Sequence, residues 1–137
     1  MKETEKMKNL SIIVTILSVI SSFGSIAQTS YSNIKQAKQE IIGTWLLEND
    51  PNTKFIYESN STVKTYYSDV LYSTHQYEIS HNCNGEKLDD QLFLKTLDNP
   101  DQAIECTYLE NINYNNNGRM TLVTQKQGKV IVLIREL

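Results

Sequence analysis

The chain has 137 residues, a formal net charge of −3 and two cysteines. That length suits one domain rather than two. The mild acidic excess is spread along the chain, and no cluster of Lys and Arg is present to hold a phosphate backbone. Nucleic acid is therefore not expected as a partner.

Residues 1–27 have the pattern of a secretory signal peptide. Three lysines precede a short apolar run, and small residues occupy the −3 and −1 positions before a cut after Ala27. Met7 offers a cleaner start of translation than Met1. Cleavage leaves residues 28–137 as an exported domain, periplasmic or secreted, with no membrane attachment. The alternative is an uncleaved anchor, for which the apolar run is short and interrupted by hydroxyl side chains.

Residues 32–40 predict a short helix. Ile34, Ala37 and Ile41 recur at i, i+3 and i+7, which places them in one narrow apolar stripe among polar residues. The alternative is a disordered leader.

From Ile41 onward, turn residues recur every eight to twelve positions, a spacing typical of an all-β sandwich or barrel. Short connections favour an up-and-down antiparallel order, because parallel strands need long crossovers. Eight such strands can close into a small barrel that its own side chains fill or that holds one small ligand. The predicted strands begin near residues 41, 53, 62, 73, 91, 102, 119 and 129.

Alternation along these strands predicts which side chains face inward. Aromatic rings with hydroxyl groups on inward faces suit an amphipathic ligand pocket. The alternative, and the more common situation, is that they fill the core, since strands favour tyrosine in any case. The predicted inward aromatic residues, and candidate ligand contacts, are Phe55, Tyr57, Tyr67, Tyr77 and Tyr108.

The inward faces of the later strands are less clearly defined by the sequence. Ile104, Cys106 and Tyr108 are predicted to face inward together, whereas the inward side of the strand from residue 91 is ambiguous. Residues 130–134 are apolar on both faces. We expect the helix to cover the outer side of this last strand; a dimer contact is the alternative.

An even number of cysteines in an exported domain predicts a disulfide, here between Cys83 and Cys106. Closing that loop stabilises the fold by about 3 kcal/mol in the chain-entropy model. The alternative is a buried free Cys106 and an exposed Cys83. His75, His81 and Cys83 could share a face, but no second pair has zinc-site spacing, so neither a metal nor another cofactor is expected.

No catalytic signature is present: the chain lacks a Gly-x-Ser-x-Gly motif, a phosphate loop and a His-Glu-x-x-His motif. Asp69, His75 and Glu78 are acid–base candidates only if they meet in one cleft, and Glu78 is predicted to face outward. The chain is therefore not expected to be an enzyme.

Gly43-Thr44-Trp45, on the first strand after a short helix, resembles the Gly-x-Trp opening of lipocalin-like barrels. The overall pattern is most similar to small secreted lipocalin-like domains of bacteria. The resemblance implies that Trp45 plugs one end of the barrel and that Arg135, on the last strand, packs over its ring. Physically, glycine lets the backbone pass closely, and a guanidinium on an indole face gains cation–π energy.

The chain is shorter than a typical lipocalin and has no Thr-Asp-Tyr-like motif, so any cavity is expected to be shallow. The function that the resemblance implies is non-enzymatic binding of a small, partly apolar molecule in or at the mouth of the barrel. The alternative is an extracytoplasmic module with a solid core that binds another protein through its loops or last strand.

Overall fold

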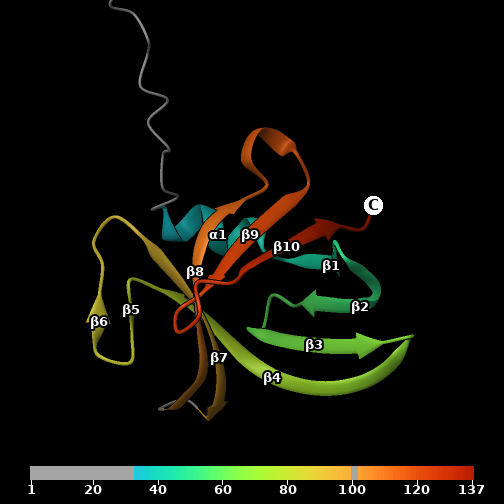
Figure 1. The fold of residues 1–137 in the computed structure, drawn as a ribbon, viewed down its shortest axis with the longest axis horizontal. Helices are drawn as coiled ribbons and strands as arrows, with labels where there is room; N and C mark the ends of the chain where they lie inside the picture. Colours follow the sequence, from blue (N-terminus) through green and yellow to red (C-terminus); the bar gives the residue numbers. More distant parts are fainter. Residues whose placement is uncertain (1–32, 100–101) are drawn as a thin grey trace, which may run out of the picture.

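A computed structural model describes residues 33–99 and 102–137. The predicted signal peptide, residues 1–27, lies outside these ranges. The described chain forms a ring of antiparallel strands, with one short helix at one end of the ring and a small hairpin beside it (Figure 1).

Eight strands hydrogen-bond around a closed barrel in the order β1-β10-β9-β8-β7-β4-β3-β2. Strands that follow one another in the chain are neighbours in the barrel, so the predicted up-and-down antiparallel barrel is confirmed. Only β4 and β7 are separated in the chain, by a two-stranded hairpin that forms a sheet of its own. The barrel strands are β1 (Gly43–Leu47), β2 (Asp50–Tyr57), β3 (Thr62–Tyr67), β4 (Val70–Ser80), β7 (Leu92–Asn99), β8 (Gln102–Ile112), β9 (Arg119–Thr124) and β10 (Val130–Arg135). The hairpin strands are β5 (Asn82–Cys83) and β6 (Glu86–Lys87), and a 3-10 turn, η1 (Tyr114–Asn116), joins β8 to β9.

The predicted helix is present as α1 (Ile34–Glu40), two residues shorter at its start than predicted. The Asn33 side chain caps it by accepting a hydrogen bond from the Gln36 backbone N–H at 3.2 Å. Ala37 and Ile41 are fully buried in the barrel core, so the apolar stripe is inserted into one end of the barrel.

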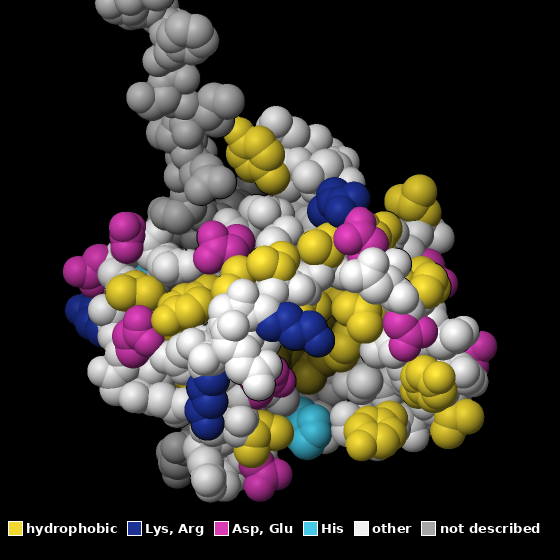
Figure 2. All heavy atoms as spheres, viewed as in Figure 1, with side chains coloured by type: hydrophobic (Ala, Val, Ile, Leu, Met, Phe, Trp, Pro, Cys, Tyr) yellow, Lys and Arg dark blue, Asp and Glu magenta, His cyan; other side chains and the backbone are white. Residues whose placement is uncertain are grey.

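The expectation that the helix covers the outer side of the last strand is wrong. Ala37 and Ile41 are buried at the end of the barrel and Ile34 packs against the same core, so the apolar stripe does not lie over β10, where Val130 remains 59% exposed. In Figure 1 α1 lies behind the strands. Figure 2, in the same view, therefore shows the opposite end of the barrel, which we call the open end.

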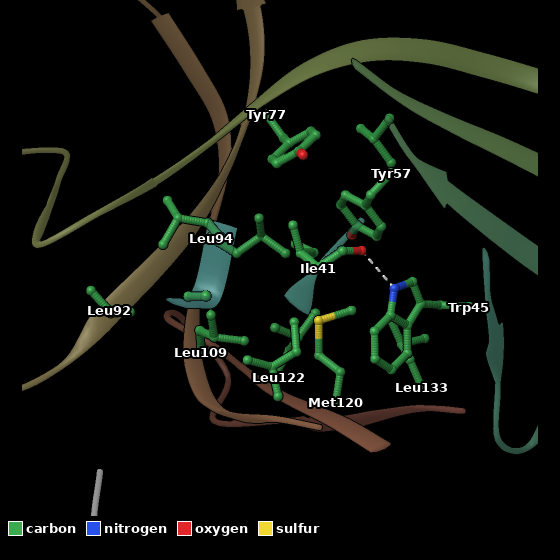
Figure 3. Close-up of a cluster of buried hydrophobic side chains, with 14 residues drawn as sticks. Ile41, Trp45, Tyr57, Tyr77, Leu92, Leu94, Leu109, Met120, Leu122 and Leu133 are labelled. Atoms are coloured by element: carbon green, nitrogen blue, oxygen red, sulfur yellow. Dashed lines mark hydrogen bonds between the residues drawn. The ribbon is translucent and has the colours of Figure 1, made fainter. Parts of the chain in front are cut away.

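The core occupies the barrel interior (Figure 3). Trp45, Met120 and Leu133 pack at the helix end, each with 1% or less of its surface exposed. Fourteen buried residues of the described chain form this one cluster: Ala37, Ile41, Trp45, Tyr57, Val63, Tyr77, Ile79, Leu92, Leu94, Leu109, Ile112, Met120, Leu122 and Leu133.

Strand β8 shows the opposite face from the one predicted. Thr107 and Leu109 point into the barrel, with Thr107 paired to an interior leucine of β7. Because side chains alternate along a strand, Cys106 and Tyr108 lie outside and Ile104 is exposed. The prediction that these three residues face inward is therefore wrong by one position.

The predicted disulfide between Cys83 and Cys106 is present, with the two Cα atoms 6.3 Å apart. It fastens the β5–β6 hairpin to the outside of the barrel, where Phe93 is buried beneath it in a second apolar cluster. The inward side of β7, which the sequence left ambiguous, is therefore settled. Phe93 faces outward, and Leu92 and Leu94 face inward. Among the described helices, none has the length and apolar character needed to cross a bilayer.

Candidate ligand-binding site

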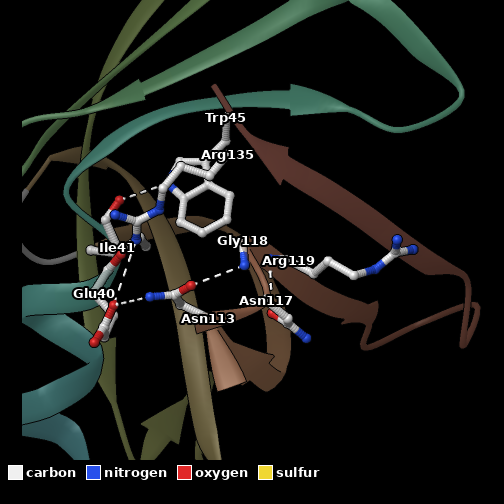
Figure 4. A network of polar contacts seen from close by, with 8 residues as sticks. All are labelled: Glu40, Ile41, Trp45, Asn113, Asn117, Gly118, Arg119 and Arg135. Carbon is white, nitrogen blue, oxygen red and sulfur yellow. Dashed lines mark hydrogen bonds and ion pairs between the residues drawn. The ribbon is translucent and has the colours of Figure 1, made fainter. Parts of the chain in front are cut away.

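The helix end of the barrel is closed by the single tryptophan (Figure 4). Trp45 is fully buried, and its indole Nε1 donates a hydrogen bond of 2.8 Å to the backbone oxygen of Ile41. The guanidinium carbon of Arg135 lies 4.7 Å from the centre of the indole ring, so the expected contact is present. Strand pairing sets it up, because Trp45 and Arg135 are direct partners across β1 and β10.

A polar network holds this arginine in place. Arg135 donates to the backbone oxygen of Glu40 at the end of α1, and its guanidinium lies 3.6 Å from a Glu40 carboxylate oxygen. Asn113, in the β8–β9 connection, donates to the same carboxylate at 2.7 Å and accepts from the Gly118 backbone N–H at 3.0 Å. The sequence does not predict the contact between Glu40 and Asn113, because 73 positions separate the two residues. The network makes this end a structural stopper.

Gly43 is required for a different reason from the one predicted. A Cβ atom placed on it meets no atom within 4 Å, so no close approach of backbone occurs there. Its φ of +137° lies in a region that L side chains rarely adopt. Glycine therefore provides the bend from α1 into β1.

The open end shows a hollow with hydrophobic side chains at its floor (Figure 2). Strand register identifies its walls, because alternate residues beyond the core continue on the inward face. His75 pairs with the core residue Val63, and Glu105 pairs with Thr96 two residues beyond the buried Thr107. We call the inward polar side chains at this end the mouth residues; they are Thr65, Ser73, His75, Thr96, Glu105 and Thr124.

Two tyrosines lie between the mouth residues and the core. Tyr57 and Tyr77 meet edge to face, with ring centres 5.1 Å apart, and both are less than a tenth exposed. The Tyr77 hydroxyl donates to the backbone oxygen of Glu58 at 3.0 Å, whereas the Tyr57 hydroxyl makes no hydrogen bond within the described chain. Burial raises the pKa of Tyr57 well above its ordinary value, and electrostatic interactions with Tyr77 and Glu105 add smaller rises. The Glu105 carboxylate thus acts electrostatically on the buried phenol.

The five predicted ligand contacts divide between three places. Tyr57 and Tyr77 lie in the barrel, and Phe55 is half-buried against the core. Tyr67 is 56% exposed, because β3 ends there at the turn to β4. Tyr108 packs in the outer cluster, because its strand is turned the other way. The inward placement of these last two residues is therefore corrected.

The candidate metal ligands do not come together. His75 faces the open end, Cys83 is in the disulfide, and His81 has its Nδ1 atom 3.0 Å from the Leu88 backbone oxygen. Among the residues that the structure describes, no three His, Cys, Asp or Glu side chains gather as a potential metal site.

The acid–base candidates also lie apart. Glu78 forms an ion pair with Lys95 at 3.2 Å, on the outer face of β4 and β7. Asp69 pairs with Lys54 at 2.9 Å, and this hydrogen bond lowers the pKa of Asp69. His75 is on the inward face, so the three do not share a cleft.

A polar pocket of about 220 Å³ lies on the outer surface, where the Lys54–Asp69 pair occupies one wall. Its lining residues are Leu46, Pro51, Asn52, Lys54, Ser68, Asp69 and Glu136. With its cation already paired, this pocket offers less for a ligand to bind than the open end does.

No model of a known protein family, no curated protein and no solved structure matches this chain. The geometry of the barrel is therefore the basis for the functional assignment that follows.

Proposed function

We propose that this protein is exported and binds a small, partly apolar ligand at the open end of its barrel, without catalysing a reaction. The observation that carries the proposal is the hollow in Figure 2, with an apolar floor and a polar rim. Such a combination lets an apolar body be buried while a few polar groups set its orientation.

The two halves of the barrel interior differ in character. The helix half is filled by Trp45, Met120 and leucines, as expected for an eight-stranded barrel with a solid core. The other half is lined by hydroxyls, an imidazole and a carboxylate. Burying such polar groups in a packed core costs free energy unless they find hydrogen-bond partners. The ligand we propose therefore enters only the outer half, above Tyr57 and Tyr77.

Two further points support the proposal. The Gly43-Thr44-Trp45 opening resembles that of lipocalin-like barrels, which hold ligands in this part of the fold. The Cys83–Cys106 disulfide suits an oxidising compartment outside the cytoplasm, in keeping with the signal peptide expected over residues 1–27.

The proposal is tested by native mass spectrometry of protein purified from the exported fraction of its own host, together with a thermal-shift panel of lipids and metabolites. We expect a bound small molecule or a ligand-dependent rise in melting temperature. Ser73→Trp, which places an indole in the mouth, should abolish that rise. Thr74→Trp, on the exposed outer face one residue further on, is the matched control and should preserve it. An empty barrel and no stabilisation across the panel would contradict the proposal.

A second function, protein–protein interaction, is favoured by the tip of the β3–β4 hairpin. Tyr67, Val70, Leu71 and Tyr72 are between 51% and 83% exposed and follow one another around a tight turn. An exposed apolar patch of this kind often marks a contact surface. A photo-crosslinking amino acid at position 72, introduced in the host, should capture one defined protein; no cross-linked product would count against this function.

A further inference from the structure

Six carboxylates of the described chain have a basic partner within 4 Å. Glu58 and Glu78, for example, lie 2.6 and 3.2 Å from the Nζ atoms of Lys64 and Lys95. Glu105 differs, because within residues 33–99 and 102–137 it makes no hydrogen bond and no ion pair. It is the one mouth residue that carries a full charge at neutral pH without a partner.

The Glu105 side chain lies on the inward face of the barrel, at its open end. The side chain starts on the inward face of β8, opposite Thr96 and two residues before the buried Thr107. Its charge reaches the buried Tyr57 phenol. Glu105 is exposed at this end of the barrel, where its charge attracts a cation and repels an anion.

The rings below Glu105 suit the same ligand chemistry. Tyr57 and Tyr77 stand at 85° to each other, and less than a tenth of each residue is exposed. A cation, including a quaternary ammonium, is attracted to the electron-rich ring of a tyrosine. The other mouth residues are uncharged hydroxyls and the imidazole of His75.

The lysines of the β9–β10 turn leave the Glu105 carboxylate without a basic partner. Lys126 and Lys129 are exposed, and neither forms an ion pair with Glu105. A basic side chain does lie at the edge of the hollow in Figure 2, but no Lys or Arg of the described residues forms an ion pair with Glu105.

We infer that the ligand of the open end is a cationic amphiphile, with an ammonium group at Glu105 and an apolar body over the two tyrosines. This inference rests on the proposed ligand-binding function and specifies its ligand class. It excludes fatty acids and other anionic amphiphiles as the preferred ligands, because their carboxylate would face Glu105.

Three probes of equal chain length test it: octyltrimethylammonium, 1-octanol and octanoate, titrated at pH 7.5 into ¹⁵N-labelled exported protein and followed by NMR. We expect the ammonium to bind at least about tenfold more tightly than the alcohol, and octanoate to bind most weakly. Shifted amides should lie on β3, β4, β7 and β8 around the mouth residues.

Glu105→Gln should reduce the affinity for octyltrimethylammonium to that for 1-octanol and leave the alcohol unaffected. The matched control is Glu136→Gln, which removes the same charge from an exposed residue after β10. Unchanged thermal unfolding of both variants shows that the fold is intact. Octanoate binding as tightly as the ammonium, or a preference that survives Glu105→Gln, would overturn the inference while leaving ligand binding itself standing. If none of the probes binds, the proposed function fails with it.

Discussion

Replacing both cysteines by alanine tests how the outer hairpin contributes to stability. Cys83 and Cys106 are 23 positions apart, and both are at least nine-tenths buried. In the chain-entropy model a loop of that length stabilises the folded state by about 3 kcal/mol, because the bond restricts the unfolded chain. For a domain of this size, 3 kcal/mol corresponds to a fall in melting temperature of roughly 12 °C.

The barrel itself should survive the change. Neither cysteine belongs to the interior cluster, and the disulfide joins the hairpin to the outer surface. Trp45 is the only tryptophan and is fully buried, so its fluorescence reports barrel unfolding without interference. Urea unfolding followed by this signal should give a lower free energy for the variant and a larger m value, since its unfolded chain exposes more surface.

Three controls sharpen the measurement. Wild-type protein in reductant should approach the stability of the double variant, and the variant should not respond to reductant at all. Hydrogen exchange should show faster exchange at the Leu88 amide, which donates to His81 across the base of the hairpin. A loss below about 1 kcal/mol would refute the entropic reasoning. A variant that loses the native Trp45 emission in water would refute the separation of hairpin and barrel.

Three other changes should show the following effects. Arg135→Lys keeps the charge but loses the planar stack on Trp45, so urea unfolding should show a loss of about 1–2 kcal/mol; wild-type stability would mean that charge alone is needed. Gly43→Ala has room for its methyl group but must adopt a φ of +137°, so the same assay should show a loss of about 1–3 kcal/mol, and no loss would remove the conformational argument. Burial raises the pKa of Tyr57, so the folded state favours the neutral phenol, and this stabilisation is complete below about pH 10 and lost as pH rises further. The free energy of unfolding should therefore fall above pH 10 by up to about 1.4 kcal/mol per pH unit for this tyrosine, and Tyr57→Phe should flatten the fall; parallel pH curves for the two proteins would contradict the assignment.

Sequence reasoning succeeded where local pattern is sufficient. Alternating side chains and regularly spaced turns predict strands, and short connections between them leave few orders other than an up-and-down barrel. The pairing of Cys83 with Cys106 required only an even count and an oxidising compartment. The contact between Trp45 and Arg135 was expected from a family resemblance rather than from any local signal.

Face assignment is where the sequence was insufficient. On β8, Cys106 and Thr107 are neighbours that must point opposite ways, but alternation does not say which one points inward. Only the packing of the β5–β6 hairpin against Phe93 decides it, and the decision turns Glu105 toward the mouth. The helix presents the same difficulty, because an amphipathic stripe fits the outside of a strand as well as the end of a barrel.

The chain by itself therefore determined the kind of fold, the number of barrel strands and the covalent link, all of which depend on residues close in sequence or on composition. The tertiary structure decided which end of the barrel is closed and which side chains line the other end. Those depend on contacts between distant segments, such as Glu40 with Asn113, and no local periodicity records which of two faces a distant segment will cover.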